Sequence, residues 1–205
     1  MKIPYKNITI RHLLNHTSGM IDYEDLTDEF WNKRDFTNQN MINLFNIHKP
    51  KLDFPAGSTS EYSNTGYVVL AYVIEKLSNQ SLEEFSKLNI FKPLGMSNTR
   101  IFTILSKDNT FPSRVYGQSN KGMDDLYYLE GVTGDGAVYS TANDLLKWHS
   151  GLQSNTLISK EVLDKAFKPT LLTNGKLSYY GFGWFLHPQS PNIIGHAGNW
   201  VGFNN

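Results

Sequence analysis

The 205-residue sequence contains no cysteine, carries no net charge and has no long hydrophobic run. Without cysteine, the chain has no disulfide bonds, no thiolate nucleophile and no cysteine-ligated zinc. Nineteen basic residues balance nineteen acidic ones without a basic cluster, so nucleic-acid binding is not expected. The most apolar run, residues 67–74, has only eight residues. It predicts a buried helix and no transmembrane segment.

Helix signals fill most of the chain, and strand signals come near its end. Capping residues and apolar spacing predict helices at residues 10–18, 38–45, 67–77, 82–92 and 160–167, with another after a cap at residues 141–144. Aromatic and β-branched residues at 179–186 and 192–196 predict a β-hairpin. The sequence therefore predicts a single α+β domain. Its helical lobe and loops occupy residues 5–170, and a sheet starts at 178–205.

Three polar residues, Tyr62, Ser63 and Asn64, precede the buried helix. A phenol held there could move a proton if neighbouring cations lower its pKa, and an asparagine amide could both donate to and accept from a substrate. The same pattern also fits a plain helix start, with Ser63 or Asn64 as the N-cap. We expect Ser63 to be a cap and not a nucleophile, because no Lys or His stands at an activating spacing.

His12 and His16 stand four residues apart, which predicts that both imidazoles lie on one helix face. The Glu of the H-E-x-x-H zinc motif is missing, because Leu13 follows His12. A metal hydrolase built on this pair remains a minor alternative. The glycines of residues 131–136 match no phosphate-binding motif, so we expect neither a metal nor a cofactor.

Five segments, taken together, resemble the class C β-lactamase and penicillin-binding-protein-like serine hydrolase family. In chain order they are TIRHLLNHTSG at residues 9–19, PAG at 55–57, YSN at 62–64, PLGM at 93–96 and HAG at 196–198. The resemblance implies the β-lactamase/transpeptidase-like fold. This chain would represent mainly the helical lobe, plus a β-hairpin of an incomplete antiparallel sheet. Exposed edges of that sheet suggest a homodimer.

The resemblance also implies roles for individual residues. Tyr62 resembles the phenol that shuttles a proton, and Asn64 the amide that orients the substrate or a lysine. His196, Ala197 and Gly198 stand where the family has K-T-G, and the backbone N–H of Asn199 would be an oxyanion donor. His in place of Lys and Ala in place of Thr favour an esterase or a D-amino-acid peptidase over an efficient β-lactamase.

The family's nucleophile lies in a Ser-x-x-Lys motif, and no lysine of this sequence has a serine three residues before it. Residues 173–176 (TNGK) come nearest to Ser-x-x-Lys, but they begin with Thr and lie in a turn downstream of Tyr62. In the family this motif lies upstream of the first matched segment. We therefore expect an internal fragment of a serine hydrolase acting on an ester, a D-amino-acid peptide or a β-lactam.

The chain alone is expected to be inactive. The alternative is a non-catalytic module of the same fold that binds peptidoglycan or a peptide. Either way, the expected partner is a small molecule or a peptidoglycan peptide. The resemblance implies a location at the cell envelope or outside the cell.

Overall fold

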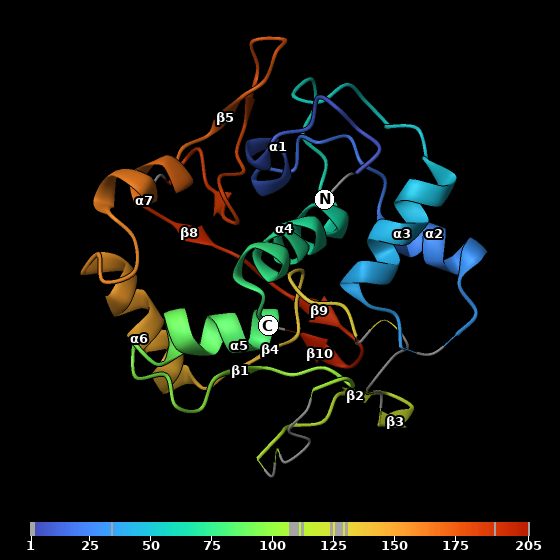
Figure 1. Ribbon diagram of the computed structural model, residues 1–205. Coiled ribbons are helices and arrows are strands. Elements are labelled where there is room, and N and C mark those ends of the chain that lie inside the picture. Colours follow the sequence, from blue (N-terminus) through green and yellow to red (C-terminus); the bar gives the residue numbers. More distant parts are fainter. Residues whose placement is uncertain are drawn as a thin grey trace.

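Helix α4 (Asn64–Ser78) lies at the centre of the molecule, and other helices pack around it (Figure 1). The computed structural model describes residues 3–33, 35–106, 111, 113–123, 125, 129, 131–190 and 192–204. Helices α1 (Ile10–Leu14), α3 (Asn38–His48) and α5 (Leu82–Ser86) contact α4. The remaining helical elements are α2 (Tyr23–Phe30), the π-helical turn η1 (Lys87–Phe91), α6 (Ala142–Gln153) and α7 (Lys160–Ala166).

The strands that the structure describes are short and pair antiparallel. The pairs are β1 (Arg100–Ile101) with β4 (Val138–Tyr139), β2 (Gln118–Ser119) with β3 (Gly122–Met123), β5 (Thr170–Leu171) with β6 (Leu177–Ser178), β7 (Phe185–Leu186) with β8 (Ile194–Gly195), and β9 (Asn199–Trp200) with β10 (Phe203–Asn204). The predicted α+β class is confirmed. The predicted division between a helical lobe and a sheet stays a prediction.

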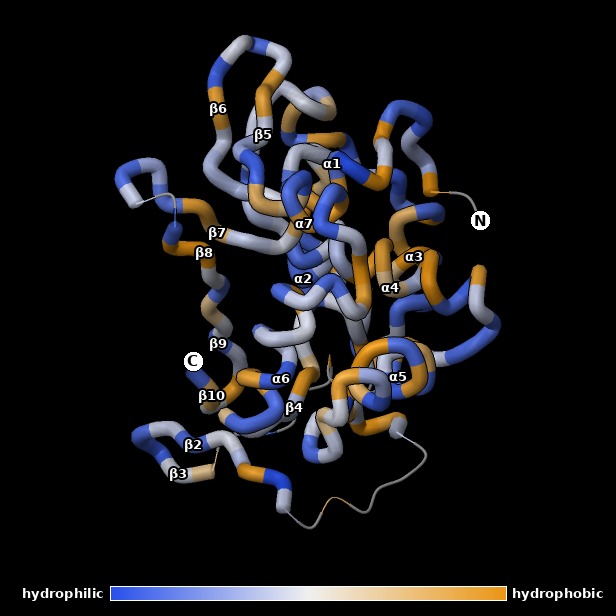
Figure 2. Tube along the Cα trace, turned by 90° about the vertical axis from the view of Figure 1, so that its left-hand side faces the viewer, coloured by the Kyte–Doolittle hydropathy of each residue, from blue (hydrophilic) through white to orange (hydrophobic). Residues whose placement is uncertain are grey.

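The main core forms where one side of α4 meets the helices near the N-terminus. Val68 and Val69 on α4 are buried, as are Met41 and Phe45 on α3. Figure 2 shows hydrophobic stretches of α3 and α4 close together, while the β7–β8 and β9–β10 pairs line one side of the molecule. Burial of such side chains contributes roughly 1.5–3 kcal/mol each. The apolar run at 67–74 is therefore a buried helix, as predicted.

Side-chain caps fix most helix starts. Thr9, Ser81, Thr141 and Ser159 each accept a hydrogen bond from a backbone N–H in the first turn of α1, α5, α6 and α7. These four helix starts were predicted and are confirmed. They could be predicted because a cap depends only on nearby residues. Helix α2 was not predicted. Its cap is Asp22, whose Oδ1 accepts from the backbone N–H of Glu24.

The predicted hairpin forms, but its first strand is shorter than expected. Only β7 and β8 pair, whereas the prediction placed a strand over residues 179–186. The chain bends at residues 181–184 because Gly181 packs directly against α7: a Cβ there would lie 2.0 Å from the carbonyl oxygen of Ala166. Just before the bend, Tyr180 lines a cleft together with Tyr67 of α4. Among the described residues, no helix is both long and apolar enough to span a membrane.

A buried carboxylate joins α6 to the segment before β1. Oδ2 of Asp144 accepts the backbone N–H of Asn98 at 2.7 Å and the hydroxyl of Thr99 at 3.0 Å, and Lys147 Nζ lies 2.7 Å from Oδ1. The hydrogen bond from Lys147 lowers the pKa of Asp144 below 3.8, its ordinary value. The carboxylate therefore stabilises the fold above about pH 4 and loses this effect as the pH falls through its folded pKa.

Asp144→Asn is expected to lower the unfolding free energy at pH 7 and to flatten its decline toward acid, because the amide cannot replace the ionised acceptor. Urea unfolding followed by circular dichroism at pH 7, 5 and 3 measures this. Asp164→Asn is the matched control, since Asp164 pairs with Lys160 in an exposed position on α7. Equal acid sensitivity in the wild type and Asp144→Asn would show that this carboxylate does not set it.

Candidate active site

Tyr62 and His196 line one cleft, although they come from distant parts of the chain. The cleft has a volume of about 200 Å³, and its wall consists of Tyr62, Tyr67, Gly134, Asp135, Tyr180, Gly183 and His196. Tyr62 precedes α4, and Tyr67 lies in the first turns of that helix. His196 follows β8. The structure thus brings together two of the predicted catalytic residues, with ring centroids 5.9 Å apart.

His196 is held by both ring nitrogens. Nδ1 lies 2.7 Å from the carbonyl oxygen of Ala197, and Nε2 lies 3.0 Å from the hydroxyl of Tyr180. A carbonyl oxygen can only accept, so Nδ1 carries the proton, and in the neutral ring Nε2 accepts the hydroxyl of Tyr180. The ring also packs on Phe185, at a centroid distance of 4.8 Å. The imidazole is therefore fixed at the cleft by contacts of the β7–β8 region.

Tyr62 presents its phenol to the cleft and is 47% exposed. Its ring lies 4.2 Å from that of His16 and stacks on Phe185 at 6.4 Å. Partial burial raises the pKa of Tyr62, and the negative charges of Asp135 and Asp22 raise it further. The sequence analysis required neighbouring cations to lower the pKa of this phenol, whereas the described neighbours are carboxylates that raise it. In this chain, Tyr62 is a protonated phenol at neutral pH.

His16 lies behind the tyrosines and is only 4% exposed. Its ring contacts those of Tyr62, Tyr67 and Tyr180 at 4.2, 5.2 and 4.5 Å. Burial, assisted by the charge of His196, lowers the pKa of His16 to about 4. The backbone N–H of Ser63 donates to Nδ1 at 3.3 Å. His16 is therefore a neutral packing residue at physiological pH.

The prediction that His12 and His16 share a helix face was wrong. Helix α1 ends at Leu14, and His16 has a φ of 55°, so the helical spacing stops between them. His12 has a separate role: its Nδ1 accepts the backbone N–H of Thr9 in the capping box. The alternative of a metal hydrolase loses the geometry on which it depended. Within the described ranges, no three His, Asp or Glu side chains are grouped to hold a metal.

Ser63 occupies the N-cap position of α4, as predicted, but its hydroxyl makes no cap hydrogen bond. In the part of the chain that the structure describes, this hydroxyl is buried without a partner. The side-chain cap comes instead from Asp22, whose Oδ2 accepts the backbone N–H of Asn64 at 2.8 Å. The side chain of Asn64 lies 3.4 Å from Glu24 Oε1 and is not part of the cleft wall.

Ala197 and Gly198 link β8 to β9, and Asn199 is the first residue of β9; all three are exposed. Of the four residues from the HAG motif to Asn199, only His196 lines the cleft. The roles of Tyr62, Asn64 and His196 in catalysis, and of these three in substrate binding, stay predictions.

Sequence reasoning missed five residues of the cleft wall, which are Tyr67, Asp135, Tyr180 and the two glycines Gly134 and Gly183, and it missed the cap provided by Asp22. Tyr67 and Tyr180 lay in segments that were assigned to a core helix and a strand. Asp135 lies between two glycines, a pattern that could have marked an exposed polar turn. Asp22 caps both α2 and α4. Only the cap of α2 could have been predicted from the sequence, because Asp22 directly precedes that helix and is far along the chain from α4.

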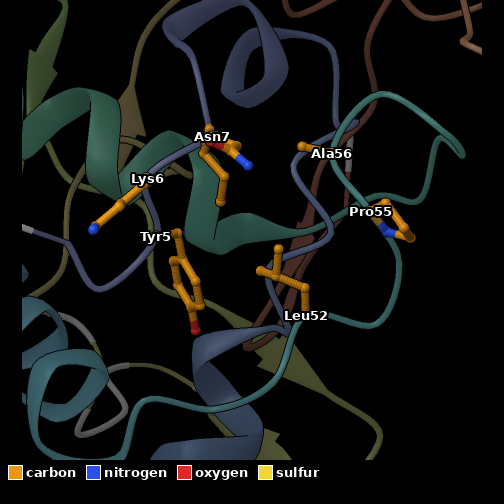
Figure 3. Close-up of a pocket in the computed structure, with 7 residues that line it drawn as sticks. Tyr5, Lys6, Asn7, Leu52, Pro55 and Ala56 are labelled. Atoms are coloured by element: carbon orange, nitrogen blue, oxygen red, sulfur yellow. The ribbon is translucent and has the colours of Figure 1, made fainter.

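A second hollow, of about 310 Å³, has a different character. It is lined by residues 5–8 and by residues 52, 55 and 56, and Figure 3 shows Tyr5, Lys6 and Asn7 across from Pro55 and Ala56. Tyr5 donates its hydroxyl to the carbonyl oxygen of Pro50 at 2.7 Å, and burial raises its pKa to about 12. This wall offers no carboxylate or imidazole, so the cleft at Tyr62 is the candidate active site.

The helices around α4 and the Tyr–His cleft define a protein of the β-lactamase/transpeptidase-like class. The family model Beta-lactamase matches residues 2–205, and the chain belongs to this family. The chain is 36% identical to penicillin-binding protein 4* of Bacillus subtilis, in a match that covers 98% of this chain and 48% of that protein.

Solved structures show the same fold. The penicillin-binding protein of Bacillus halodurans superposes with a TM-score of 0.76 and 26% identity, over 100% of this chain and 63% of its own. D-amino acid amidase of Ochrobactrum anthropi, solved with L-phenylalanine amide, has a TM-score of 0.72 and 25% identity, over 96% of this chain and 59% of its own. The chain spans about half the length of the curated relatives that it matches.

Proposed function

We propose that this chain supplies the proton-transfer side of the active site of a serine hydrolase, which forms an acyl-enzyme on an ester, a D-amino-acid peptide or a β-lactam. One observation carries the proposal: Tyr62 and His196, from two separate family motifs, line the same cleft. The relatives named above, penicillin-binding proteins and a D-amino acid amidase, agree with this class of chemistry.

In this proposal, Tyr62 exchanges a proton with the nucleophile and the leaving group. Its pKa is raised in this chain, so it begins as a donor, and a lysine ammonium beside it would lower that pKa and allow it to act as a base. His196 supplies a positive charge when its ring is protonated, or a hydrogen bond when Nε2 exchanges the Tyr180 hydroxyl for the substrate. Asn64 orients the substrate, and the Asn199 N–H stabilises the oxyanion. Ala197 brings no hydroxyl for a substrate carboxylate, which favours esters and amides over β-lactams.

The chain alone is expected to form no stable acyl adduct, because its 205 residues contain no Ser-x-x-Lys. Intact mass spectrometry after incubation with a fluorescent penicillin, and separately with p-nitrophenyl acetate, measures this. The matched comparison is a longer chain that adds a Ser-x-x-Lys segment upstream, which should gain one acyl group on that serine. A stoichiometric adduct on Ser63 of the 205-residue chain would overturn the assignment.

The second candidate is a non-catalytic module that binds peptidoglycan or a peptide. It is favoured by one observation: the described residues form the cleft without a nucleophilic serine. A Ser-x-x-Lys segment encoded upstream in the gene would reject it. A homodimer through the edges of β7–β8 and β9–β10 also stays a prediction.

A further inference from the structure

We infer that His16 is a positioning residue, which holds the Tyr62 phenol at the cleft and does so only while its own imidazole is neutral. Protonation of this ring would release the segment that carries Tyr62. The contacts concern this chain alone. Only the use of the Tyr62 position in proton transfer rests on the proposed function.

Three consecutive residues of the segment before α4 contact His16. The backbone N–H of Glu61 donates to the carbonyl oxygen of His16 at 3.0 Å, and the backbone N–H of Ser63 donates to its Nδ1 at 3.3 Å. Between them, the ring of Tyr62 lies 4.2 Å from the imidazole, measured between the ring centroids. Both chain neighbours of Tyr62 are thus bonded to one residue, which restricts where the phenol can lie.

The backbone of His16 adopts a conformation that few residues other than glycine adopt. Its φ of 55° lies in the left-handed region, and such a residue persists only where the surrounding contacts hold it. His16 directly follows Asn15, the C-cap of α1, and both its carbonyl oxygen and its side chain accept from the segment before α4. A left-handed residue with these contacts beside a candidate catalytic group fits a positioning role.

The hydrogen bond from Ser63 requires the neutral ring. Because Nδ1 accepts it, the single proton of the neutral imidazole is on Nε2, which is buried without a partner in the part of the chain that the structure describes. A second proton, on Nδ1, would face the Ser63 N–H, and two donors cannot bond each other. It would also place a charge on a side chain that is only 4% exposed. The charged ring is therefore expected to leave this position.

The titratable groups that face His16 also disfavour its charged form. They are the phenols of Tyr62 and Tyr67 at α4, the phenol of Tyr180 before β7 and the imidazole of His196 after β8. Burial, followed by the charge of His196, lowers the pKa of His16 to about 4. Once the segment is released and the ring is exposed, its pKa would be the ordinary value of about 6.5.

The two pKa values define the pH window in which release becomes easier. Between pH 6.5 and 4, only the released form takes up a proton, so release becomes about 10-fold more favourable for each unit by which the pH falls. Above this window neither form takes up the proton, and below it both do. The hold on Tyr62 is therefore strongest at neutral pH and weakest below about pH 4.

Asp22 is the other group whose protonation could loosen this segment. Its Oδ2 accepts the backbone N–H of Asn64, and burial raises its pKa above 3.8, the ordinary value. The acid effect of Asp22 would reach the segment from the α4 side, through the cap. A test of His16 must separate the two groups.

Nuclear magnetic resonance on the unmodified 205-residue chain provides the first test and needs no substrate. The Cε1–H signal of the His16 ring, identified by its loss in His16→Asn, should titrate with a midpoint near pH 4. The protection of the Ser63 amide from hydrogen exchange, corrected for the intrinsic rate, should fall about 10-fold per pH unit from pH 6.5 toward 4. A ring that titrates near pH 6.5, or a Ser63 protection that does not change in this window, would overturn the inference.

Substitutions separate His16 from Asp22. His16→Asn keeps an acceptor in the place of Nδ1, tolerates the left-handed backbone and cannot become charged. Its Ser63 amide should stay protected at pH 7 and lose the pH dependence, whereas His16→Ala should lose about 10-fold of the protection at pH 7. Asp22→Asn is the matched control and should keep the pH dependence. If the dependence persisted in His16→Asn, it would belong to Asp22 and the inference would fail.

Kinetics distinguish this inference from the proposed function. In a protein that joins this chain to a Ser-x-x-Lys segment, His16→Ala should lower kcat for a p-nitrophenyl ester at least about 10-fold at pH 7 with little change in KM, and His16→Asn should recover most of it. If the amide measurements came out as expected while His16→Ala kept its kcat, the contacts of His16 would stand and the proposed role of Tyr62 would fail.

Discussion

Tyr62→Phe, in a protein that joins this chain to a Ser-x-x-Lys segment, is expected to lower kcat for a p-nitrophenyl ester by about 10²- to 10⁴-fold, the usual contribution of general acid–base catalysis. Phenylalanine keeps the ring contacts with His16 and Phe185 and removes only the hydroxyl at the cleft. KM should change little, because the loss concerns proton transfer and not binding. Steady-state kinetics and the single-turnover acylation rate measure both effects.

Tyr72→Phe provides the matched control for this prediction. Tyr72 lies on the same helix, but its hydroxyl donates to Gln39 Oε1 at 2.7 Å outside the cleft. Its loss should leave kcat unchanged and cost about 1 kcal/mol of stability. If Tyr62→Phe kept its activity within about 2-fold while folding normally, Tyr62 would not be the proton shuttle.

Local chemistry explains which parts of the fold could be predicted. Thr9, Ser81, Thr141 and Ser159 reach a backbone N–H within three residues, so their sequence neighbours suffice to place the helix starts. The apolar run of α4 was similarly clear. Helix α2 was missed because its segment is mostly polar and aromatic. Leu26 is its one buried aliphatic residue, which is too few to show a helical period.

The candidate site was only partly predictable, because its wall depends on contacts between distant segments. The motifs containing Tyr62 and His196 indicated two of its residues. Tyr180 stands next to Gly181, which packs against α7, and Asp135 stands next to Gly134, which packs against α4; neither long-range contact has a signal in the local sequence. His16 was wrongly placed on α1, because four-residue spacing predicts a common face only while the helix continues, and α1 ends at Leu14.

The loop that carries Asp135 reaches α4 through Gly134, and Gly134→Ala is expected to lower the unfolding free energy by about 2–4 kcal/mol. Gly134 has a φ of +111°, and a Cβ there would lie 2.5 Å from the carbonyl oxygen of Tyr67 and 2.6 Å from Cβ of Ala71. Both atoms belong to the rigid core helix, so the loop must move away. Urea unfolding followed by circular dichroism measures the loss.

The matched control lies two residues along the same loop. Gly136→Ala meets no atom within 4 Å, and its effect should stay within about 1 kcal/mol. The same contact also positions the cleft wall, because moving Gly134 moves its neighbour Asp135, which lines the cleft with three tyrosines. Equal stability of the two variants would show that this close approach does not position the loop.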